Sequence, residues 1–436
     1  MFGLNFEKIQ LSKNLLPSIF YKGINVIFSL LIVRFSIEYI GSESYGVWLT
    51  MFSFFTWFSA VEAGVSRSLR KKLTIYFSEK KTSSVALLIG KGYKNLAILF
   101  LIIISILVLI SFFTPFAELF TGSLKMGFSN FKFLFVICTV LYISHFIFFF
   151  LNTILLSFHR PEDTYRLTAF QNAIIIAGIL FLKYASFESN FFYFCVWLSL
   201  APLLTWVLAG AYYFNGPLNT FKPKKKVLFP TQFKPLKKIN TSFFIIQVCT
   251  LIIYSTDHLI ITNYLSGTEV TKYNIGFKYF NLLTIVFNII ILPYWSMFSE
   301  AAHKKNKSWI KLHIKKLIIV LMAITFFAVI MLLFSDYFYL LWIGKDLNIS
   351  FTLSVFMALS TLITAWIKIF MFYLNSIEDL KPQRNLLLIS AVINLPLSIF
   401  LLSIWGAAGV IMATFISLLP LAFMLPIRYR YVLAKL

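Results

Sequence analysis

Long apolar stretches recur along this chain and constrain its fold more than any other feature of the sequence. Each is about 20 residues long or longer, the length an α-helix needs to cross the hydrocarbon core of a bilayer. The stretches occupy residues 15–37, 45–65, 88–113, 131–157, 164–183, 191–213, 241–265, 273–298, 312–335, 350–375, 385–403 and 407–427. We therefore expect an all-α polytopic membrane protein with twelve transmembrane helices.

The composition excludes the common soluble classes. Hydrophobic residues make up 59% of the 436 residues and charged residues only 13%, where soluble globular proteins are about one quarter charged. Too few polar side chains remain to cover the surface of a soluble enzyme, and the same balance argues against a disordered chain or a secreted disulfide scaffold.

The distribution of positive charge predicts the orientation of the helices. The chain carries 39 Lys and Arg against 16 Asp and Glu, a net charge of +23, and the connections after even-numbered stretches hold most of the excess. Basic connections lie on the cytoplasmic side of a membrane. Both termini are therefore expected in the cytoplasm, and the excess charge is explained without a nucleic-acid partner.

One basic connection divides the chain in two. Residues 214–240 are rich in Pro and Lys and carry no acidic residue, which predicts a cytoplasmic linker near anionic headgroups. On this division, residues 1–213 form an N-terminal six-helix bundle and residues 241–436 form a C-terminal six-helix bundle.

Weak internal similarity supports a duplication. A match of Tyr45 with Tyr273 gives an offset of 228 residues and places Ser29 on Asp257, while Asn152 matches Asn375 at an offset of 223. Both halves begin and end on the same side of the membrane. The repeat is therefore expected to be parallel, with its pseudo-twofold axis along the membrane normal.

Polar residues recur at helical spacing within five of the expected helices. One polar stripe usually makes hydrogen bonds between helices, but five stripes at corresponding places in two halves predict a shared hydrated cavity. The stripes are Lys22, Asn25 and Ser29; His145 and Asn152; Gln247, Thr250, Tyr254 and Asp257; Lys278, Asn281, Thr284 and Asn288; and Thr361, Thr364, Lys368 and Asn375.

The charge of this expected cavity is mainly positive and suits an anionic solute, such as a phosphate, a diphosphate or an acidic sugar. The candidate anion-binding residues are Lys22, His145, Lys278, Asn281, Lys368 and Asn375. Asp257 is the candidate counter-charge or coupling-cation site. Two alternatives stay open: Lys22 reaching the cytoplasmic headgroups, and His145 serving as a hydrogen-bonded packing residue.

Catalytic motifs are absent from the sequence. It contains no GxxxxGK[ST], HExxH, GxSxG or CxxC pattern, and no outer connection exceeds about 17 residues. A membrane-embedded polysaccharide polymerase or glycosyltransferase is therefore disfavoured, and we expect neither an enzyme nor a bound cofactor or metal. The energy source is left open between a proton or sodium gradient, the membrane potential and the gradient of the substrate.

Three segments resemble a known transporter family. The segments are Gly41-Ser-Glu-Ser-Tyr-Gly-Val-Trp48, Val61-Glu-Ala-Gly-Val-Ser-Arg-Ser-Leu-Arg70, and the region from Asn375 through Gly406-Ala-Ala-Gly409 to Ser417. They resemble the Wzx-type O-antigen and capsule-unit flippases of the multidrug/oligosaccharidyl-lipid/polysaccharide exporter superfamily. One departure is clear, because Glu378-Asp379 stands where a glycine is usual in this family.

The resemblance implies a substrate that the residues alone leave open. This is an undecaprenyl-diphosphate-linked oligosaccharide, moved from the cytoplasmic to the outer leaflet of the bacterial inner membrane by alternating access. It further implies contact with membrane lipids and with a polysaccharide polymerase. The nearest alternative is a cation-coupled multidrug exporter of the same superfamily, whose organic cations suit acidic cavities. The major facilitator pattern is not matched, since Gly64-Val-Ser-Arg67 lacks the expected Asp.

Overall fold

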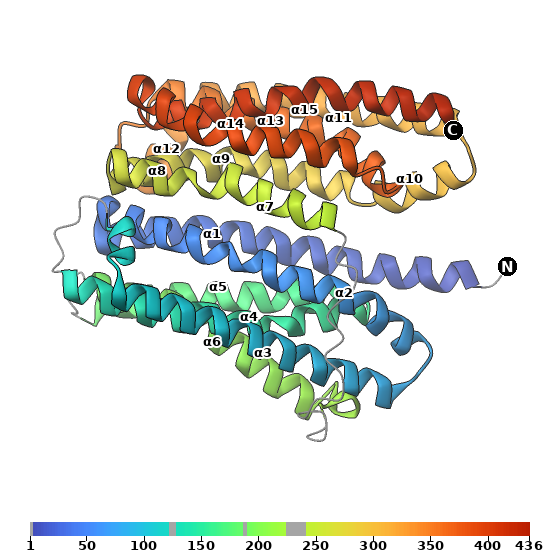
Figure 1. Cartoon of the computed structure of the whole chain (residues 1–436), viewed down its shortest axis with the longest axis horizontal. Coiled ribbons are helices and arrows are strands. Elements are labelled where there is room, and N and C mark those ends of the chain that lie inside the picture. The colour runs from blue at the N-terminus through green and yellow to red at the C-terminus, as the bar shows by residue number, and fades with distance from the viewer. Residues whose placement is uncertain (1–2, 122–127, 186–189, 224–240) are drawn as a thin grey trace. The chain divides into compact units, whose positions relative to one another are not determined.

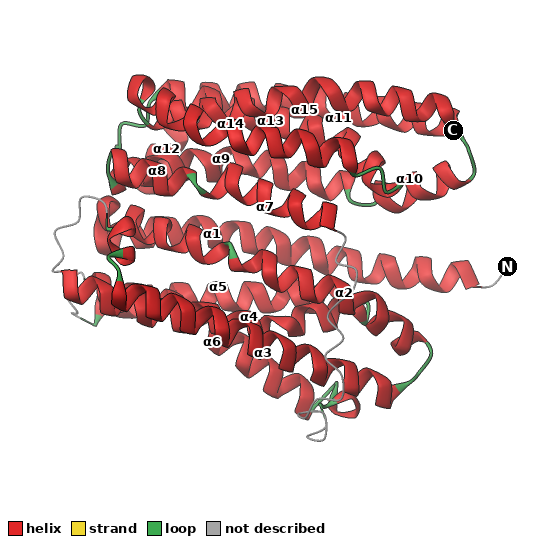
Figure 2. Cartoon of the chain, in the orientation of Figure 1, coloured by secondary structure: helices red, strands yellow, loops and turns green. Residues whose placement is uncertain are grey.

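The computed structural model describes residues 3–121, 128–185, 190–223 and 241–436. Within these ranges the chain forms helices joined by turns, without a strand (Figure 2). It divides into two compact units, Met1–Ile239 and Asn240–Leu436. Most of the expected basic linker, residues 224–240, lies outside the described residues.

The first unit contains six α-helices (Figure 1) within the residues described. These are α1 (Gly3–Thr56), α2 (Phe58–Ser78), α3 (Thr82–Phe113), α4 (Phe128–Ser157), α5 (Pro161–Tyr184) and α6 (Phe191–Asn215). Two short 3₁₀ turns, η1 (Phe116–Phe120) and η2 (Asn219–Phe221), follow α3 and α6.

The second unit has the same order of long helices, with three short helices added. Its helices are α7 (Thr241–Ser255), α8 (Asp257–Tyr264), α9 (Gly267–Ile291), α10 (Tyr294–His303), α11 (Lys307–Leu333), α12 (Ser335–Ile343), α13 (Phe351–Ser376), α14 (Lys381–Trp405) and α15 (Ala407–Lys435).

The helices confirm the expected membrane fold. Eleven helical segments of the described chain are long and apolar enough to cross a bilayer, and the first of them, Pro17–Ser66, is 50 residues long. At about 1.5 Å per residue that segment is long enough to cross twice. Gly41, with φ 79° and ψ 165°, interrupts its helical path. A side chain with a Cβ rarely adopts this φ, so glycine permits the turn between the first two crossings.

Helix pairing follows the same order inside each unit. In the first unit α1 packs on α5, while α4 packs on α2, α3 and α6. In the second unit α7 packs on α14, while α13 packs on α9, α11 and α15. These pairs correspond one to one when the two sets of six crossings are matched in order. The two units therefore share one architecture, as the offset between Tyr45 and Tyr273 predicts.

The outer faces of both units carry the apolar side chains that a bilayer requires. On α3, α11 and α14, exposed residues include Phe113, Phe327 and Val392. Inside the second unit α14 and α15 pack closely, because a Cβ on Gly409 would lie 2.1 Å from the Leu401 carbonyl oxygen. The apolar exterior and the close interior contacts are typical of helices that associate in lipid.

The described helices differ from the expected spans in three places. The span expected over 241–265 is two helices, because the helix breaks at Thr256. The span expected over 273–298 breaks before α10, where Pro293 lies directly ahead of the new helix. The outer connection after residue 335 contains α12, a nine-residue helix of mainly aromatic and aliphatic residues that the sequence analysis treats as a connection.

Candidate functional site

The polar face of α13 bonds two neighbouring helices of the second unit. The hydroxyl groups of Thr364 on α13 and Tyr254 on α7 lie 3.0 Å apart. One turn further on, Lys368 Nζ donates a hydrogen bond to Asn288 Oδ1 of α9 at 3.2 Å. The polar stripe predicted on this helix thus contacts the polar stripes of two neighbouring helices.

Lys368 has an uncharged partner in a place where charge is costly. A lysine at the centre of a membrane helix costs about 2.5–3.5 kcal/mol on insertion scales. None of the ion pairs formed by the described residues involves Lys368 or Lys22. The ammonium of Lys368 is half-buried and bonds a neutral amide. Such a cation can accept an incoming anion without first giving up a carboxylate.

The polar stripe of α9 extends from this lysine toward the other end of the helix. Lys278 and Asn281 are half-buried and lie ten and seven residues before Asn288, so Lys278 is about 15 Å away along the helix axis. Asn375, the last residue of the α13 stripe, accepts a hydrogen bond from the Gln383 amide of α14. The second unit therefore carries two lysines and two amides of the predicted set on the polar stripes of two helices that pack together.

Asp257 lies at the helix break between α7 and α8. Its side chain is 1% exposed, and Oδ2 accepts a hydrogen bond from the Tyr273 hydroxyl. The second oxygen, Oδ1, is buried without a hydrogen-bond partner among the described residues. Asp257 and Tyr273 are the two residues that the repeat offset matches to Ser29 and Tyr45, so the carboxylate is a feature of the second unit alone. This free oxygen can hold a proton or a small cation.

Lys22 contacts α5 in the first unit. Its Nζ lies 4.7 Å from the centre of the Tyr165 ring, a distance at which a cation is attracted to the ring face. Asn25, one turn along, donates to the Tyr165 carbonyl at 3.1 Å and accepts from the Asn172 amide at 3.1 Å. The stripe on α1 is thereby joined to α5 by polar contacts.

His145 lies among aromatic rings. It is 6% exposed, its Nδ1 lies 2.7 Å from the Tyr142 carbonyl oxygen, and its ring centre is 4.3 Å from that of Phe146. These contacts match the packing alternative that the sequence leaves open for this residue.

Ion pairs hold the cytoplasmic turns of both units, and the sequence analysis did not anticipate them. In the first unit Asp163 pairs with Arg160 and Arg166, each at 2.6 Å. In the second unit Asp379 accepts two bonds from Arg428 of α15, at 2.7 and 3.1 Å. Both units thus share one feature: an acidic residue soon after the fourth or tenth crossing forms an ion pair with an arginine.

The backbone at Glu378, which stands where a glycine is usual in the family, has a conformation typical of glycine. Glu378 has φ 61°, the left-handed conformation that glycine usually supplies.

The sequence analysis did not identify two residues that contact the candidate residues. Tyr165 and Asn172 of α5 were not among the candidate residues, yet both contact the α1 stripe. Their spacing of seven residues, with Thr168 between them, is a polar stripe that a search of the fifth span finds. The described part of the chain holds no group of three or more His, Cys, Asp and Glu arranged for a metal ion.

Relatives in sequence are named as putative O-antigen transporters or export proteins. No family model matches the chain. A "Putative O-antigen transporter" of Salmonella typhi is 22% identical over 408 residues, which cover 92% of this chain and 91% of the relative. A "Putative O-antigen export protein" of Yersinia pseudotuberculosis is 21% identical and covers 80% of this chain and 79% of the relative.

Solved structures with the same fold are membrane transporters. A multidrug resistance MATE family transporter of the MOP superfamily, in an inward-facing conformation, matches 96% of this chain and 99% of its own with a TM-score of 0.69 and 13% identity. The lipid II flippase MurJ, in an inward closed conformation, matches 95% of this chain and 87% of its own with a TM-score of 0.66 and 16% identity. The resemblance found in the sequence is confirmed: the chain is a multi-pass inner-membrane protein that shares its fold with these solved transporters, and its relatives are named as putative O-antigen transporters.

Proposed function

We propose that this protein flips a polyprenyl-diphosphate-linked oligosaccharide from the cytoplasmic to the outer leaflet, for the synthesis of a surface polysaccharide such as O-antigen or capsule. The relatives named as O-antigen exporters and the fold shared with a lipid II flippase support this substrate class. Transport proceeds by alternating access, in which a cationic cavity opens to one side of the membrane at a time.

The observation that carries the proposal is the bond between Lys368 and Asn288. The lysine keeps its charge beside a neutral acceptor, so a diphosphate displaces an amide, which is a weak competitor for an ammonium group. Lys278 and Asn281 extend the same surface, roughly 15 and 10 Å further along α9 than Asn288, and there they meet sugars of the glycan. Lys22 and Asn375 are the remaining residues that we assign to the substrate. His145, a candidate from the sequence, is left out because it packs among aromatic rings.

Asp257 takes the coupling role in this scheme. Its unbonded oxygen is protonated or binds Na⁺ in one conformation and is released in another, which links transport to an ion gradient. We expect no bound cofactor. Its partners are the lipid-linked glycan, the surrounding lipids and the polymerase that consumes the flipped product.

The test is a substitution at Lys368. In a strain that lacks the gene, Lys368→Ala is expected to reduce surface polysaccharide at least about tenfold, the effect of losing roughly 1.4 kcal/mol of binding. Lys368→Arg retains the charge and is expected to keep a measurable part of the activity. Surface polysaccharide is quantified on gels and compared at equal amounts of membrane-inserted protein.

A matched control is Lys272→Ala. Lys272 pairs with Glu269 at 2.7 Å at the start of α9 and lies outside the proposed set, so its loss is expected to leave export near the wild-type level. Normal export by Lys368→Ala at wild-type protein levels would remove Lys368 from the substrate site.

A second candidate function is cation-coupled multidrug export. The fold shared with a MATE family multidrug transporter favours it. Overexpression that protects cells from cationic dyes, together with normal polysaccharide in a deletion strain, is the result expected from this alternative. Loss of polysaccharide without a change in dye resistance is the result expected from the flippase.

A further inference from the structure

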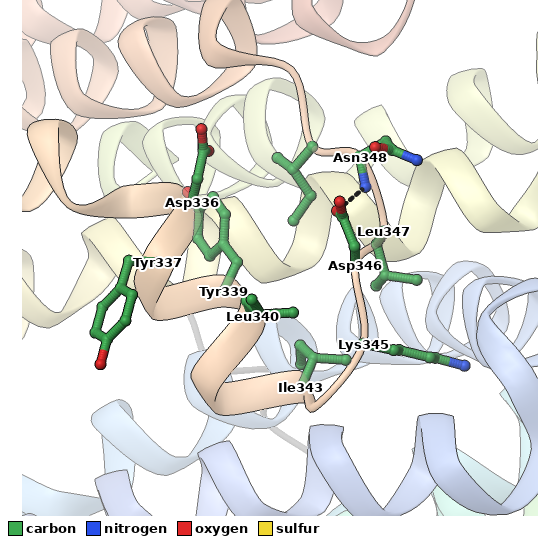
Figure 3. Close-up of a pocket in the computed structure, with 10 residues that line it drawn as sticks. Asp336, Tyr337, Tyr339, Leu340, Ile343, Lys345, Asp346, Leu347 and Asn348 are labelled. Atoms are coloured by element: carbon green, nitrogen blue, oxygen red, sulfur yellow. Dashed lines mark hydrogen bonds between the residues drawn. The ribbon is translucent and has the colours of Figure 1, made fainter.

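A pocket outside the lysine site lies within the second unit, between α12 and the loop of residues 345–349. It has a volume of about 320 Å³, within the range of roughly 300–1,000 Å³ that small-ligand sites occupy. Figure 3 shows the pocket with Leu340 and Ile343 directed from α12 toward this loop. Neither polar stripe described above contributes a residue to it.

The pocket is on the outer side of the membrane by the charge distribution of the chain. It follows the carboxyl end of α11, whereas the lysines of that helix, Lys307, Lys311, Lys315 and Lys316, lie in its first ten residues. Basic helix ends are cytoplasmic, and α11, with 27 residues, is about 40 Å long. A flipped glycan emerges on the side where this pocket lies.

The walls of the pocket are held in place by contacts within the second unit. Tyr339 is 5% exposed, and its hydroxyl lies 3.0 Å from the Ser354 hydroxyl of α13. Trp342 and Ile343 are buried, so α12 is anchored by one face. Across the pocket, Asp346 Oδ1 accepts a hydrogen bond from the Asn348 backbone N–H at 2.7 Å (Figure 3). A ligand therefore meets a site whose side chains are already positioned, which lowers the entropic cost of binding.

The lining has the chemistry of a site for sugars. Asp336, Asp346 and Asn348 supply hydrogen-bond acceptors, and one oxygen of Asp346 is left for a ligand. Leu340, Ile343 and further aliphatic side chains form an apolar wall. A pyranose ring combines hydroxyl donors on its edge with apolar C–H groups on its faces, so it matches both surfaces. An anionic ligand is disfavoured, because the pocket holds two carboxylates and one lysine, and Lys345 extends away from α12 in Figure 3.

We propose that this outer pocket binds a neutral or amino sugar of the glycan as it leaves the transporter. The inference rests on the proposed function for the identity of the glycan, but it assigns a second contact, separate from the lysines that bind the diphosphate. Occupation of the pocket holds the glycan on the outer side and opposes its return. The lipid diphosphate takes no part in this contact.

The test uses the full-length protein in lipid nanodiscs and a lipid-free probe. The probe is the repeat-unit oligosaccharide released by mild acid from the surface polysaccharide of the source strain, and binding is measured by saturation-transfer NMR. Asp346→Ala is expected to weaken binding about tenfold, because it removes an acceptor. Leu340→Trp, which fills the pocket from a half-exposed position, is expected to abolish it.

Two controls separate this inference from the proposed function. Glu118→Ala removes an exposed outer carboxylate of η1 in the first unit and is expected to bind the probe as the wild type does. Lys368→Ala is expected to lose export but to keep binding the lipid-free probe. Unchanged melting temperatures show that the two pocket variants are folded.

Three results would overturn the proposal. The first is wild-type binding by both Asp346→Ala and Leu340→Trp. The second is binding of the diphosphate-linked glycan with no binding of the released oligosaccharide, which leaves the flippase function standing without the pocket. The third is saturation of the pocket by Ca²⁺ alone, with no effect of the oligosaccharide.

Discussion

At Lys368 the choice of partner decides what the residue can do. The ammonium bonds the Asn288 amide rather than a carboxylate, so its positive charge is not cancelled locally. A carboxylate partner would stabilise the charged form of a buried lysine. The same partner would make that lysine less available to an anion. The neutral partner therefore leaves the ammonium group available to an incoming anion.

This argument predicts the effect of Asn288→Asp. A carboxylate at this position lies within ion-pair distance of Lys368 Nζ and competes with a substrate phosphate. We expect melting temperature and protein level at or above the wild type, with export reduced by about tenfold or more. Thermal unfolding in detergent and polysaccharide assays measure the two effects. Asn288→Gln, which keeps an amide, is the control, and equal loss in both variants would contradict the charge argument.

A second prediction concerns the turn residue Glu378. Its left-handed conformation, φ 61°, costs an ordinary L residue about 1–2 kcal/mol. Asparagine adopts this conformation more readily, so Glu378→Asn is expected to stabilise the protein by up to about 1 kcal/mol. Glu378→Val is expected to destabilise it, because a β-branched side chain fits this conformation poorly.

The comparison is made by thermal unfolding of the two purified variants. Glu378 is exposed and its side chain is not part of either proposed binding surface, so export should follow the amount of folded protein. A destabilised Asn variant would show that the Glu378 side chain makes a contact that outweighs the backbone strain.

At the scale of helices, the contact between α14 and α15 leaves no room for a methyl group at Gly409. The nearest atom to an added Cβ is a backbone oxygen, that of Leu401 at 2.1 Å, and backbone cannot move aside as a flexible side chain can. Gly409→Ala is therefore expected to destabilise the second unit by about 1–3 kcal/mol or more and to lower the amount of membrane-inserted protein.

Gly210 supplies the matched control for this prediction. It lies in α6, where nothing is within 4 Å of an added Cβ, so Gly210→Ala is expected to leave the protein level unchanged. Fluorescence-detection size-exclusion chromatography of both variants measures the difference. Similar profiles for the two variants would contradict the close packing of α14 on α15.

The sequence predicts long helices better than it predicts where they break. Hydropathy over about 20 residues detects a crossing, so the twelve spans were within reach. The break at Thr256 has no proline or glycine to mark it, and α12 is too short for a hydropathy window. The sequence identifies Lys368 and Asn288 as stripe residues, but their bond depends on how α9 rotates against α13, which the spacing within one helix cannot determine.

At the scale of the whole molecule, the charge distribution predicts which ends of the helices face outward. Each unit begins and ends in the cytoplasm on this topology. Cysteine labelling tests it directly, because the three native cysteines, Cys138, Cys195 and Cys249, are free and buried and give little background.

The expected pattern is simple in intact cells treated with a membrane-impermeant maleimide. Cysteines placed at Glu118 and Lys345, one in each unit, are expected to react from outside, whereas cysteines at Lys80 and Lys311 react only after the membrane is opened. All four positions are exposed in the structure. Labelling of Glu118 and Lys345 from opposite sides would refute the parallel relation of the two units.

The matching helix order of the two units also bears on how such a chain can originate. A gene for one unit encodes an even number of crossings, so its product starts and finishes in the same compartment. Tandem duplication then joins two copies through any hydrophilic tether, without inventing an extra crossing or inverting one copy. Differences in charge, such as Asp257 at the position that matches Ser29, can arise afterwards. One copy then diverges while the other keeps the ancestral side chain.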